Sequence, residues 1–277
     1  MATKATSLRK KSTVTKPRAR TAAAAAASTP MATMYQSVCK TLKDMPLIGH
    51  LVAEFVGAFL LTTAFLEMQG NPLFVGFALA GVVLVVGGVT GAHVNPAMTF
   101  GAWATRKITW LYALGYIVAQ LLGASVAYLV LNTFLHGSGV AASTAGAPVL
   151  FHAATIASGK EWYVFFAELL GSTVLGLGVA TSLRMKNNKI VAAFAAGLAF
   201  LTALYIVMSL TTVLLTEANV TLTFLNPAIA FAANGLSWNW WPVSIYIIAP
   251  LLGGVVGFGL AQLFHSQSEA CDCVECK

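Results

Sequence analysis

The chain has 277 residues, of which 58% are hydrophobic and only 9% are charged. Soluble domains carry about 25% charged residues, so this composition excludes an ordinary soluble protein and favours a membrane protein. The net charge of +7 does not indicate a nucleic-acid partner, because seven of the sixteen Lys and Arg residues lie within the first twenty positions. Four cysteines, three of them among the last seven residues, are too few and too clustered for a disulfide scaffold.

Residues 1–46 form a basic segment with no acidic residue before Asp44. Serine, threonine and a run of six alanines separate the cations. We expect a disordered cytosolic arm that helps to fix the orientation in the membrane. An organelle transit peptide, which is also rich in arginine and serine and poor in acids, is the alternative.

Six segments are apolar enough and long enough to cross a bilayer, which takes about 20 residues as a helix. They are predicted over residues 47–68, 73–90, 108–132, 161–183, 190–212 and 242–264. With the N-terminus inside, fifteen of the sixteen Lys and Arg residues fall in inside segments and only Lys160 falls outside. The positive-inside rule therefore predicts a multi-pass protein with both termini in the cytosol, in the plasma membrane or an organelle membrane.

Two triplets, Asn95-Pro96-Ala97 and Asn226-Pro227-Ala228, interrupt the apolar pattern. Asparagine is a favoured N-cap and proline is tolerated in the first turn, so each triplet predicts the start of a helix. A helix from Pro96 to Trp103 would be about 12 Å long, under half of a hydrocarbon core of about 30 Å. Two such half-helices entering from opposite faces would meet near the midplane. Irregular backbone is tolerated there only where protein buries it or water lines it, so the pair predicts a pore.

The two halves of the chain repeat each other. Residues 116–124 closely match residues 246–254, and residues 53–57 are echoed by residues 167–171. Each half, about 47–132 and 161–264, holds three spans, so the second half enters the membrane from the opposite side. The predicted fold class is an all-α membrane protein with six transmembrane helices and two re-entrant half-helices in an inverted repeat.

These residues carry a resemblance to the aquaporin, or major intrinsic protein, family. The segment Thr90 to Thr99, the second Asn-Pro-Ala triplet and the Ala-Glu-Phe of the first span are similar to family motifs, and the likeness covers residues 47–264. It implies an aquaporin-like bundle and a homotetramer with one pore per subunit. It also implies a passive channel for water and small uncharged solutes. No nucleotide-binding loop, catalytic triad or metal cluster stands in the sequence, so we expect neither an enzyme nor a cofactor.

Asn95 and Asn226, held as caps, are predicted to donate hydrogen bonds from their side-chain amides into the pore. Two helix N-termini, each with about half a positive charge, would repel cations there. A charge inside a span costs about 2.5 kcal/mol or more, so Glu54 and Glu168 need partners. The resemblance implies that both glutamates are structural supports that brace the half-helix loops. His93 is expected to be another loop brace, with a pH gate as the alternative.

The sequence departs from the family pattern at the selectivity filter that the resemblance implies. The family usually has arginine directly after the second Asn-Pro-Ala, and this chain has Ile229. The filter position in the second span, often aromatic, matches Val75. The matching position in the loop before the second triplet is Thr223.

The fifth-span filter position is harder to place, because the second half carries extra residues before its triplet. Leu204 is the best match, with Tyr205 and Met208 as alternatives. The predicted filter is therefore apolar and lacks its cation. The aspartate that glycerol-type members carry shortly after the second triplet is absent too, so neither standard subclass fits.

The leading functional hypothesis is a passive channel for water and small neutral solutes such as glycerol, urea or ammonia. A secondary transporter is one alternative, but only the two glutamates could couple an ion at the midplane. A structural membrane protein with a closed pore is the other. Residues 265–277 are predicted to form a short cytosolic tail. Its cysteines lack the spacing of a zinc site, so the open alternatives are that they are acylated or that they are unmodified.

Overall fold

The computed structural model describes residues 31, 46–137, 150–185, 187–237 and 239–275. The chain divides into two units, and every helix and strand named below belongs to the second unit, Met45–Lys277. The basic arm predicted over residues 1–46 lies almost entirely outside the described residues. Its disorder and its alternative role as a transit peptide therefore stay predictions.

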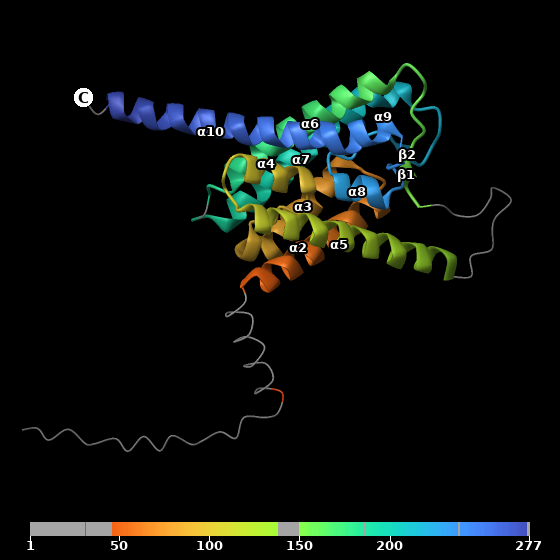
Figure 1. Ribbon diagram of the computed structural model, residues 1–277, viewed down its shortest axis with the longest axis horizontal. Helices are drawn as coiled ribbons and strands as arrows, with labels where there is room; N and C mark the ends of the chain where they lie inside the picture. Colours follow the sequence, from red (N-terminus) through yellow and green to blue (C-terminus); the bar gives the residue numbers. More distant parts are fainter. Residues whose placement is uncertain (1–30, 32–45, 138–149, 186, 238, 276–277) are drawn as a thin grey trace, which may run out of the picture. The chain divides into compact units, whose positions relative to one another are not determined.

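Six helices in the described part of the chain are long and apolar enough to cross a membrane. Each begins within two residues of a predicted span, so the predicted fold class is confirmed. The first five spans are α2 (Pro46–Glu67), α3 (Pro72–Thr90), α5 (Trp110–Gly137), α6 (Glu161–Ser182) and α7 (Lys189–Thr211), and α10 (Ala249–Glu275) forms the later part of the sixth span, which starts at Trp240 (Figure 1).

The last span differs from the prediction at both ends. It begins with a short helix, α9 (Trp240–Val243), and a π-helical turn, η2 (Ser244–Ile248), before α10 continues to Glu275. The apolar pattern ends near residue 264, but adding residues to an existing helix is far easier than starting one. Much of the predicted tail, residues 265–277, is therefore helical, while its cysteine side chains lie outside the described part.

Two short helices begin at the Asn-Pro-Ala triplets, as predicted: α4 (Pro96–Ala104) and α8 (Pro227–Ala232). Asn95 and Asn226 are their N-caps, with extended backbone at φ −155° and −149°. Each asparagine Oδ1 accepts a hydrogen bond from the backbone N–H two residues ahead, at 2.8 Å in α4 and 3.0 Å in α8. Proline lacks a backbone N–H. At the first helical position this costs no hydrogen bond, because an N–H there would have no partner within the helix.

The packing repeats between the two halves, as an inverted repeat predicts. α2 packs against α5 as α6 packs against α10, and α8 packs against α5 as α4 packs against α10 (Figure 1). α3 packs against its own counterpart, α7, where Gly76 and Gly197 face each other. A Cβ atom on Gly197 would lie 2.5 Å from the Gly76 carbonyl oxygen, so only glycine lets these two backbones approach so closely.

The loop that leads into α8 is where the two halves differ most. After α7 the chain makes a 3-10 turn, η1 (Thr212–Leu214), and a strand, β2 (Val220–Thr221), before it reaches Asn226. β2 pairs in parallel with β1 (His152–Ala153), in the segment that precedes α6. The pairing ties the two loops together and accommodates most of the extra residues of the second half.

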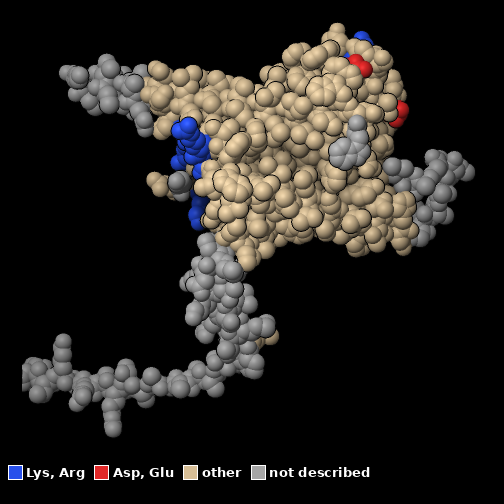
Figure 2. All heavy atoms as spheres, viewed as in Figure 1, with Lys and Arg blue, Asp and Glu red and all other residues tan. Residues whose placement is uncertain are grey.

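Charged side chains gather at opposite ends of the bundle (Figure 2). The turns after α4 and α6 and the start of α7 form a basic end, which carries Arg106, Lys107, Arg184 and Lys189. The turns after α2 and α7 and the start of α6 form an acidic end, which carries Glu67, Glu161 and Glu217 as well as Lys160. The two ends therefore differ in the sign of their charge.

Candidate pore and selectivity filter

The loops before α4 and α8 are joined by a reciprocal pair of hydrogen bonds. Asn95 Nδ2 donates to the Leu225 carbonyl oxygen at 2.8 Å, and Asn226 Nδ2 donates to the Val94 carbonyl oxygen at 3.0 Å. An amide nitrogen has two N–H groups, so each asparagine keeps one side-chain N–H that is not used in this pair of bonds. The sequence analysis predicted that the side-chain amides of both asparagines would be free to donate into the pore. In the structure one N–H of each amide is already used, because each asparagine lies beside the peptide group that precedes the other asparagine.

Both acceptor carbonyls belong to residues in an unusual conformation. Val94 and Leu225 have φ of +43° and +55°, and each comes directly before its asparagine. Left-handed backbone costs a non-glycine residue roughly 1–2 kcal/mol, so it persists only where surrounding contacts hold it. The matching distortion in both loops indicates that the crossing point is built the same way from each side.

Two buried glutamates, Glu54 and Glu168, accept hydrogen bonds from the backbone of these two loops. Glu54 of α2 accepts hydrogen bonds from the backbone N–H groups of His93, at 3.0 Å, and Val94, at 2.7 Å. Glu168 of α6 accepts from Phe224 and Leu225 in the equivalent loop. A loop inside a membrane cannot satisfy its N–H groups with lipid, so each carboxylate takes the place of water.

Sequence reasoning missed two residues that support only the first brace. Gln120 Nε2 donates to Glu54 Oε2 at 2.6 Å and to Thr99 Oγ1 at 2.9 Å, which links α2, α5 and α4. In the second half of the repeat, Pro250 is equivalent to Gln120 and Ala230 is equivalent to Thr99, and neither of these side chains has a hydrogen-bond donor. A signal was available, because an amide in the middle of an apolar span needs a partner.

His93 acts through its main chain rather than through its ring. Its backbone N–H is one of the donors to Glu54, while its Nδ1 is buried without a hydrogen-bond partner among the described residues. The ring lies edge-on to Tyr116, with centroids 5.5 Å apart. Tyr116 in turn places its hydroxyl 3.0 Å from Nδ1 of His50. The predicted loop brace at this position is thus a peptide group, not the imidazole.

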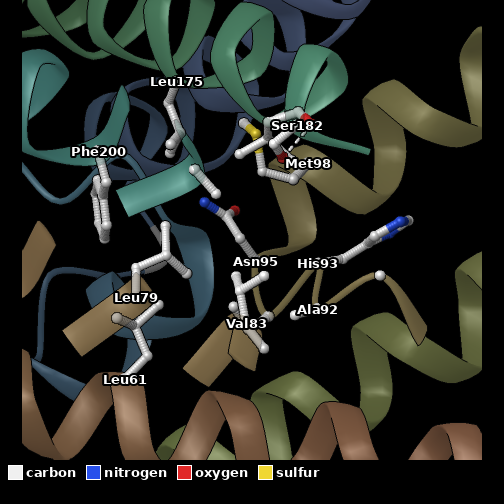
Figure 3. Close-up of a pocket in the computed structure, with 14 residues that line it drawn as sticks. Leu61, Leu79, Val83, Ala92, His93, Asn95, Met98, Leu175, Ser182 and Phe200 are labelled. Carbon is white, nitrogen blue, oxygen red and sulfur yellow. Dashed lines mark hydrogen bonds between the residues drawn. The ribbon is translucent and has the colours of Figure 1, made fainter. Parts of the chain in front are cut away.

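A narrow cavity extends from Asn95 toward the basic end of the bundle. Figure 3 shows the Asn95 amide reaching toward Leu79, Leu175 and Phe200, while the His93 ring points away from them. Apart from Asn95, His93 and Ser182, the lining is mostly apolar: Leu61, Leu79, Val83, Met98, Leu175, Val179 and Phe200 contribute to it. A molecule here would find its hydrogen bonds mainly at the asparagine.

The four predicted filter residues lie on the acidic side of the crossing and are all completely buried. They come from α3, α7, the loop before α8 and the first turn of α8: Val75, Leu204, Thr223 and Ile229. The three aliphatic members belong to one hydrophobic cluster. Thr223 Oγ1 is buried with no hydrogen-bond partner among the described residues, so it is the single free polar group that this set offers.

The fifth-span alternatives separate clearly. Leu204 is fully buried, whereas the neighbouring Tyr205 is 68% exposed and points away from the interior of the bundle. Met208 is half-buried and packs against the hydrophobic cluster one turn further on. The burial pattern of α7 therefore favours Leu204 as the residue that faces the interior at this level.

A row of aromatic rings packs against the loop before α8. Phe151, Phe65, Phe224 and Tyr246 follow one another with centroid separations of 6.0, 5.7 and 5.3 Å. The Tyr246 hydroxyl donates to the carbonyl of Leu222 at 3.3 Å. The rings and this hydrogen bond pack the loop against α2, η2 and the segment before β1.

The sequence model of the major intrinsic protein family matches residues 41–261. The chain belongs to this family. It is 31% identical over 204 residues to aquaporin AqpM of Methanothermobacter thermautotrophicus, covering 69% of this chain and 75% of that protein. It is 30% identical over 230 residues to glycerol uptake facilitator protein-like 6 of Lactiplantibacillus plantarum, covering 78% of this chain and 98% of the relative.

A solved member of the major intrinsic protein family has the same fold. The X-ray structure of the aquaglyceroporin from Plasmodium falciparum aligns with a TM-score of 0.55, covering 83% of this chain and 100% of that chain. The sequence identity in this alignment is 22%, so the comparison speaks for the fold alone. It agrees with the six spans and two half-helices described above.

Proposed function

We propose that the protein is a passive channel for water and small uncharged solutes. The observation that carries this proposal is the reciprocal bonding of Asn95 and Asn226, which leaves one amide donor from each at the point where the two half-helices meet. A neutral molecule with a hydrogen-bond acceptor can exchange partners there without meeting a fixed charge. Relatives named as aquaporins and as a glycerol uptake facilitator-like protein support the same class of solute.

Cation exclusion in this proposal rests on the two helix ends. The N-termini of α4 and α8 face each other, and each presents about half a positive charge. The proposed filter adds no charge of its own, because Val75, Leu204, Thr223 and Ile229 are all uncharged. Water that turns its oxygen toward both asparagines cannot form a continuous proton wire.

The proposed filter favours solutes with a partly apolar body. An arginine at position 229 would narrow the passage and donate hydrogen bonds, whereas isoleucine is shorter and offers none. Polar molecules lose about 1–3 kcal/mol for each hydrogen bond left unmade in such a collar. Glycerol, urea and ammonia therefore compete with water better here than they would at a charged ring.

The charge distribution supports a cytosolic location for the basic end and for both termini, by the positive-inside rule. In this arrangement residues 1–46 are a cytosolic arm, residues 47–264 form the channel, and the cavity beside Asn95 opens to the cytosol. We include a homotetramer with one pore per subunit in the proposal. The exposed apolar side chains of the long helices provide surface for both lipid and neighbouring subunits.

The proposal is tested by replacing Asn95 or Asn226 with aspartate. Each change removes an amide donor and places a carboxylate between the two positive helix ends, which offsets their repulsion of cations. We expect lower water and glycerol flux in proteoliposomes and a cation conductance in planar bilayers. Unchanged flux in both variants, with no cation current, would show that these asparagines do not line the conducting path.

A closed pore is the second candidate, because all four filter side chains are completely buried. In that case a solute would cross only if Leu204 and Ile229 moved apart. The aspartate variants would then start from a wild type that conducts nothing, so the flux of the wild type separates the two candidates.

A further inference from the structure

The half-helices α4 and α8 end in the same backbone motif but with different residues. After α4, the N–H of Lys107 donates to the Ala102 carbonyl at 2.7 Å, and the N–H of Arg106 donates to the Trp103 carbonyl at 2.9 Å. After α8, the equivalent bonds run from Gly235 to Ala230 at 2.8 Å and from Asn234 to Phe231 at 3.3 Å. Both are Schellman caps, which close a helix with one left-handed residue.

The left-handed position is filled in the usual way only after α8. Asn234 has φ of +57°, and asparagine is among the few residues that tolerate this region. The equivalent residue after α4 is Arg106, with φ of +60°. The left-handed backbone conformation is strained for arginine, and glycine or asparagine would form the same cap more easily. The backbone motif therefore does not account for the arginine.

Contacts within the protein do not account for it either. Arg106 and Lys107 are both exposed, and neither side chain forms an ion pair or a hydrogen bond with another described residue. Gly235, in contrast, is buried, and a Cβ there would lie 3.0 Å from the Ala230 carbonyl oxygen. One cap is thus shaped by packing, while the other presents two exposed cations to its surroundings.

The surroundings of Arg106 and Lys107 have the composition of a membrane interface. Trp103 and Trp110 stand on either side of the pair in sequence and are 40% and 66% exposed. Tryptophan concentrates at the depth of lipid headgroups. The same end of the bundle carries Arg184, whose buried Nη1 has no hydrogen-bond partner among the described residues.

Together with Lys189, these cations form one basic face, which Figure 2 shows at a single end of the bundle. The described turns after α4 and α6 contain no aspartate or glutamate, whereas the last turns of α10 carry Glu269, Asp272 and Glu275 in the sequence. Basic residues at headgroup depth attract the anionic headgroups of lipids.

We propose that Arg106 and Lys107, with Arg184 and Lys189, form a binding surface for the phosphate headgroups of anionic lipids in the leaflet at the basic end. The cap of α4 holds the first two cations at headgroup depth between the two tryptophans. Arg184 and Lys189 add positive charge at the same end of the bundle. This inference does not depend on which solute the pore conducts.

The chain itself offers a matched variant, in which Arg106→Asn and Lys107→Gly give α4 the cap of α8. We would titrate purified protein in neutral detergent with phosphatidylserine or phosphatidylcholine and count bound lipids by native mass spectrometry. Wild type is expected to prefer phosphatidylserine, and the double variant to bind it about thirtyfold more weakly, as expected for the loss of two interfacial cations. Lys160→Gln, which removes a cation at the acidic end, is the control and should bind as wild type does.

Two further measurements keep the test independent of folding and of conduction. The double variant should melt at the same temperature as wild type or higher, because its cap is less strained, and water flux in phosphatidylcholine vesicles should be unchanged. Inorganic phosphate added in place of lipid should not stabilise wild type. Equal binding of the two lipids by wild type, full phosphatidylserine binding by the double variant, or an equal effect of inorganic phosphate would each overturn the proposal.

Discussion

At the scale of single residues, Gln120 is the part of the site that distinguishes the two braces. It gives Glu54 a third donor and also bonds Thr99, whereas the repeat supplies no side-chain donor to Glu168. We expect Gln120→Leu to destabilise the protein by about 1.5–3 kcal/mol, the usual loss for a hydrogen bond to a charged group. Thermal unfolding in detergent measures the change.

The control for this prediction is Gln262→Leu, an exposed glutamine on α10. It should leave the unfolding temperature close to that of wild type, since no buried partner is left unsatisfied. If both variants unfold at the wild-type temperature, the Gln120 bond contributes nothing measurable to the brace.

Ile229 makes the second prediction at this scale. It lies in the first turn of α8, fully buried, where the family usually has an arginine. Ile229→Arg should narrow the proposed filter and add donors, so glycerol and urea flux should fall by a larger factor than water flux. The ratio of the permeabilities in proteoliposomes is the measured quantity. A wild type that passes water alone, with no change of ratio in the variant, would place the constriction elsewhere.

At the scale of elements, α7 presents two very different faces at adjacent positions. Leu204 is completely buried and Tyr205 is 68% exposed, so a substitution at one position controls for the other. Leu204→Ala should enlarge the filter and raise glycerol flux severalfold, because a leucine side chain would no longer fill the passage. Tyr205→Ala should leave glycerol flux unchanged. The reverse order of effects would show that Tyr205 faces the pore.

The elements also show which parts of the structure the sequence could predict. The spans follow from length and apolarity, and the starts of α4 and α8 follow from local capping chemistry at Asn95 and Asn226. The sequence predicted Leu204 as the best match but left Tyr205 and Met208 open, because the extra residues before α8 break the spacing of the repeat. Burial around the helix supports Leu204.

Contacts between distant elements were also beyond the sequence. The bonds of Gln120 to Glu54 and Thr99 join α5 to α2 and α4, and their partners depend on helix packing rather than on spacing. The reciprocal bonds of the two asparagines depend likewise on how close the loops come. Helix length past the last apolar residue, as in α10, is set by backbone hydrogen bonds that hydropathy does not register.

At the scale of the whole molecule, the two sides of the inverted repeat differ in structure. A narrow cavity leads to Asn95 from the basic end, while the four completely buried side chains of the proposed filter lie toward the acidic end. The shared crossing point keeps the twofold pattern, with one glutamate, one left-handed residue and one asparagine from each half. In the proposed channel, the buried filter on the acidic side therefore sets the rate of solute flux and the choice of solute.

The most direct test of this account is the swelling or shrinking of proteoliposomes that contain the wild-type protein, followed by stopped flow without any ion gradient. Water, glycerol and urea serve as the osmotic probes, and empty liposomes of the same lipid serve as the control. The account predicts downhill flux of water and of at least one small neutral solute, with no accompanying ion current. Flux no faster than in empty liposomes, or flux that requires an ion gradient, would contradict it.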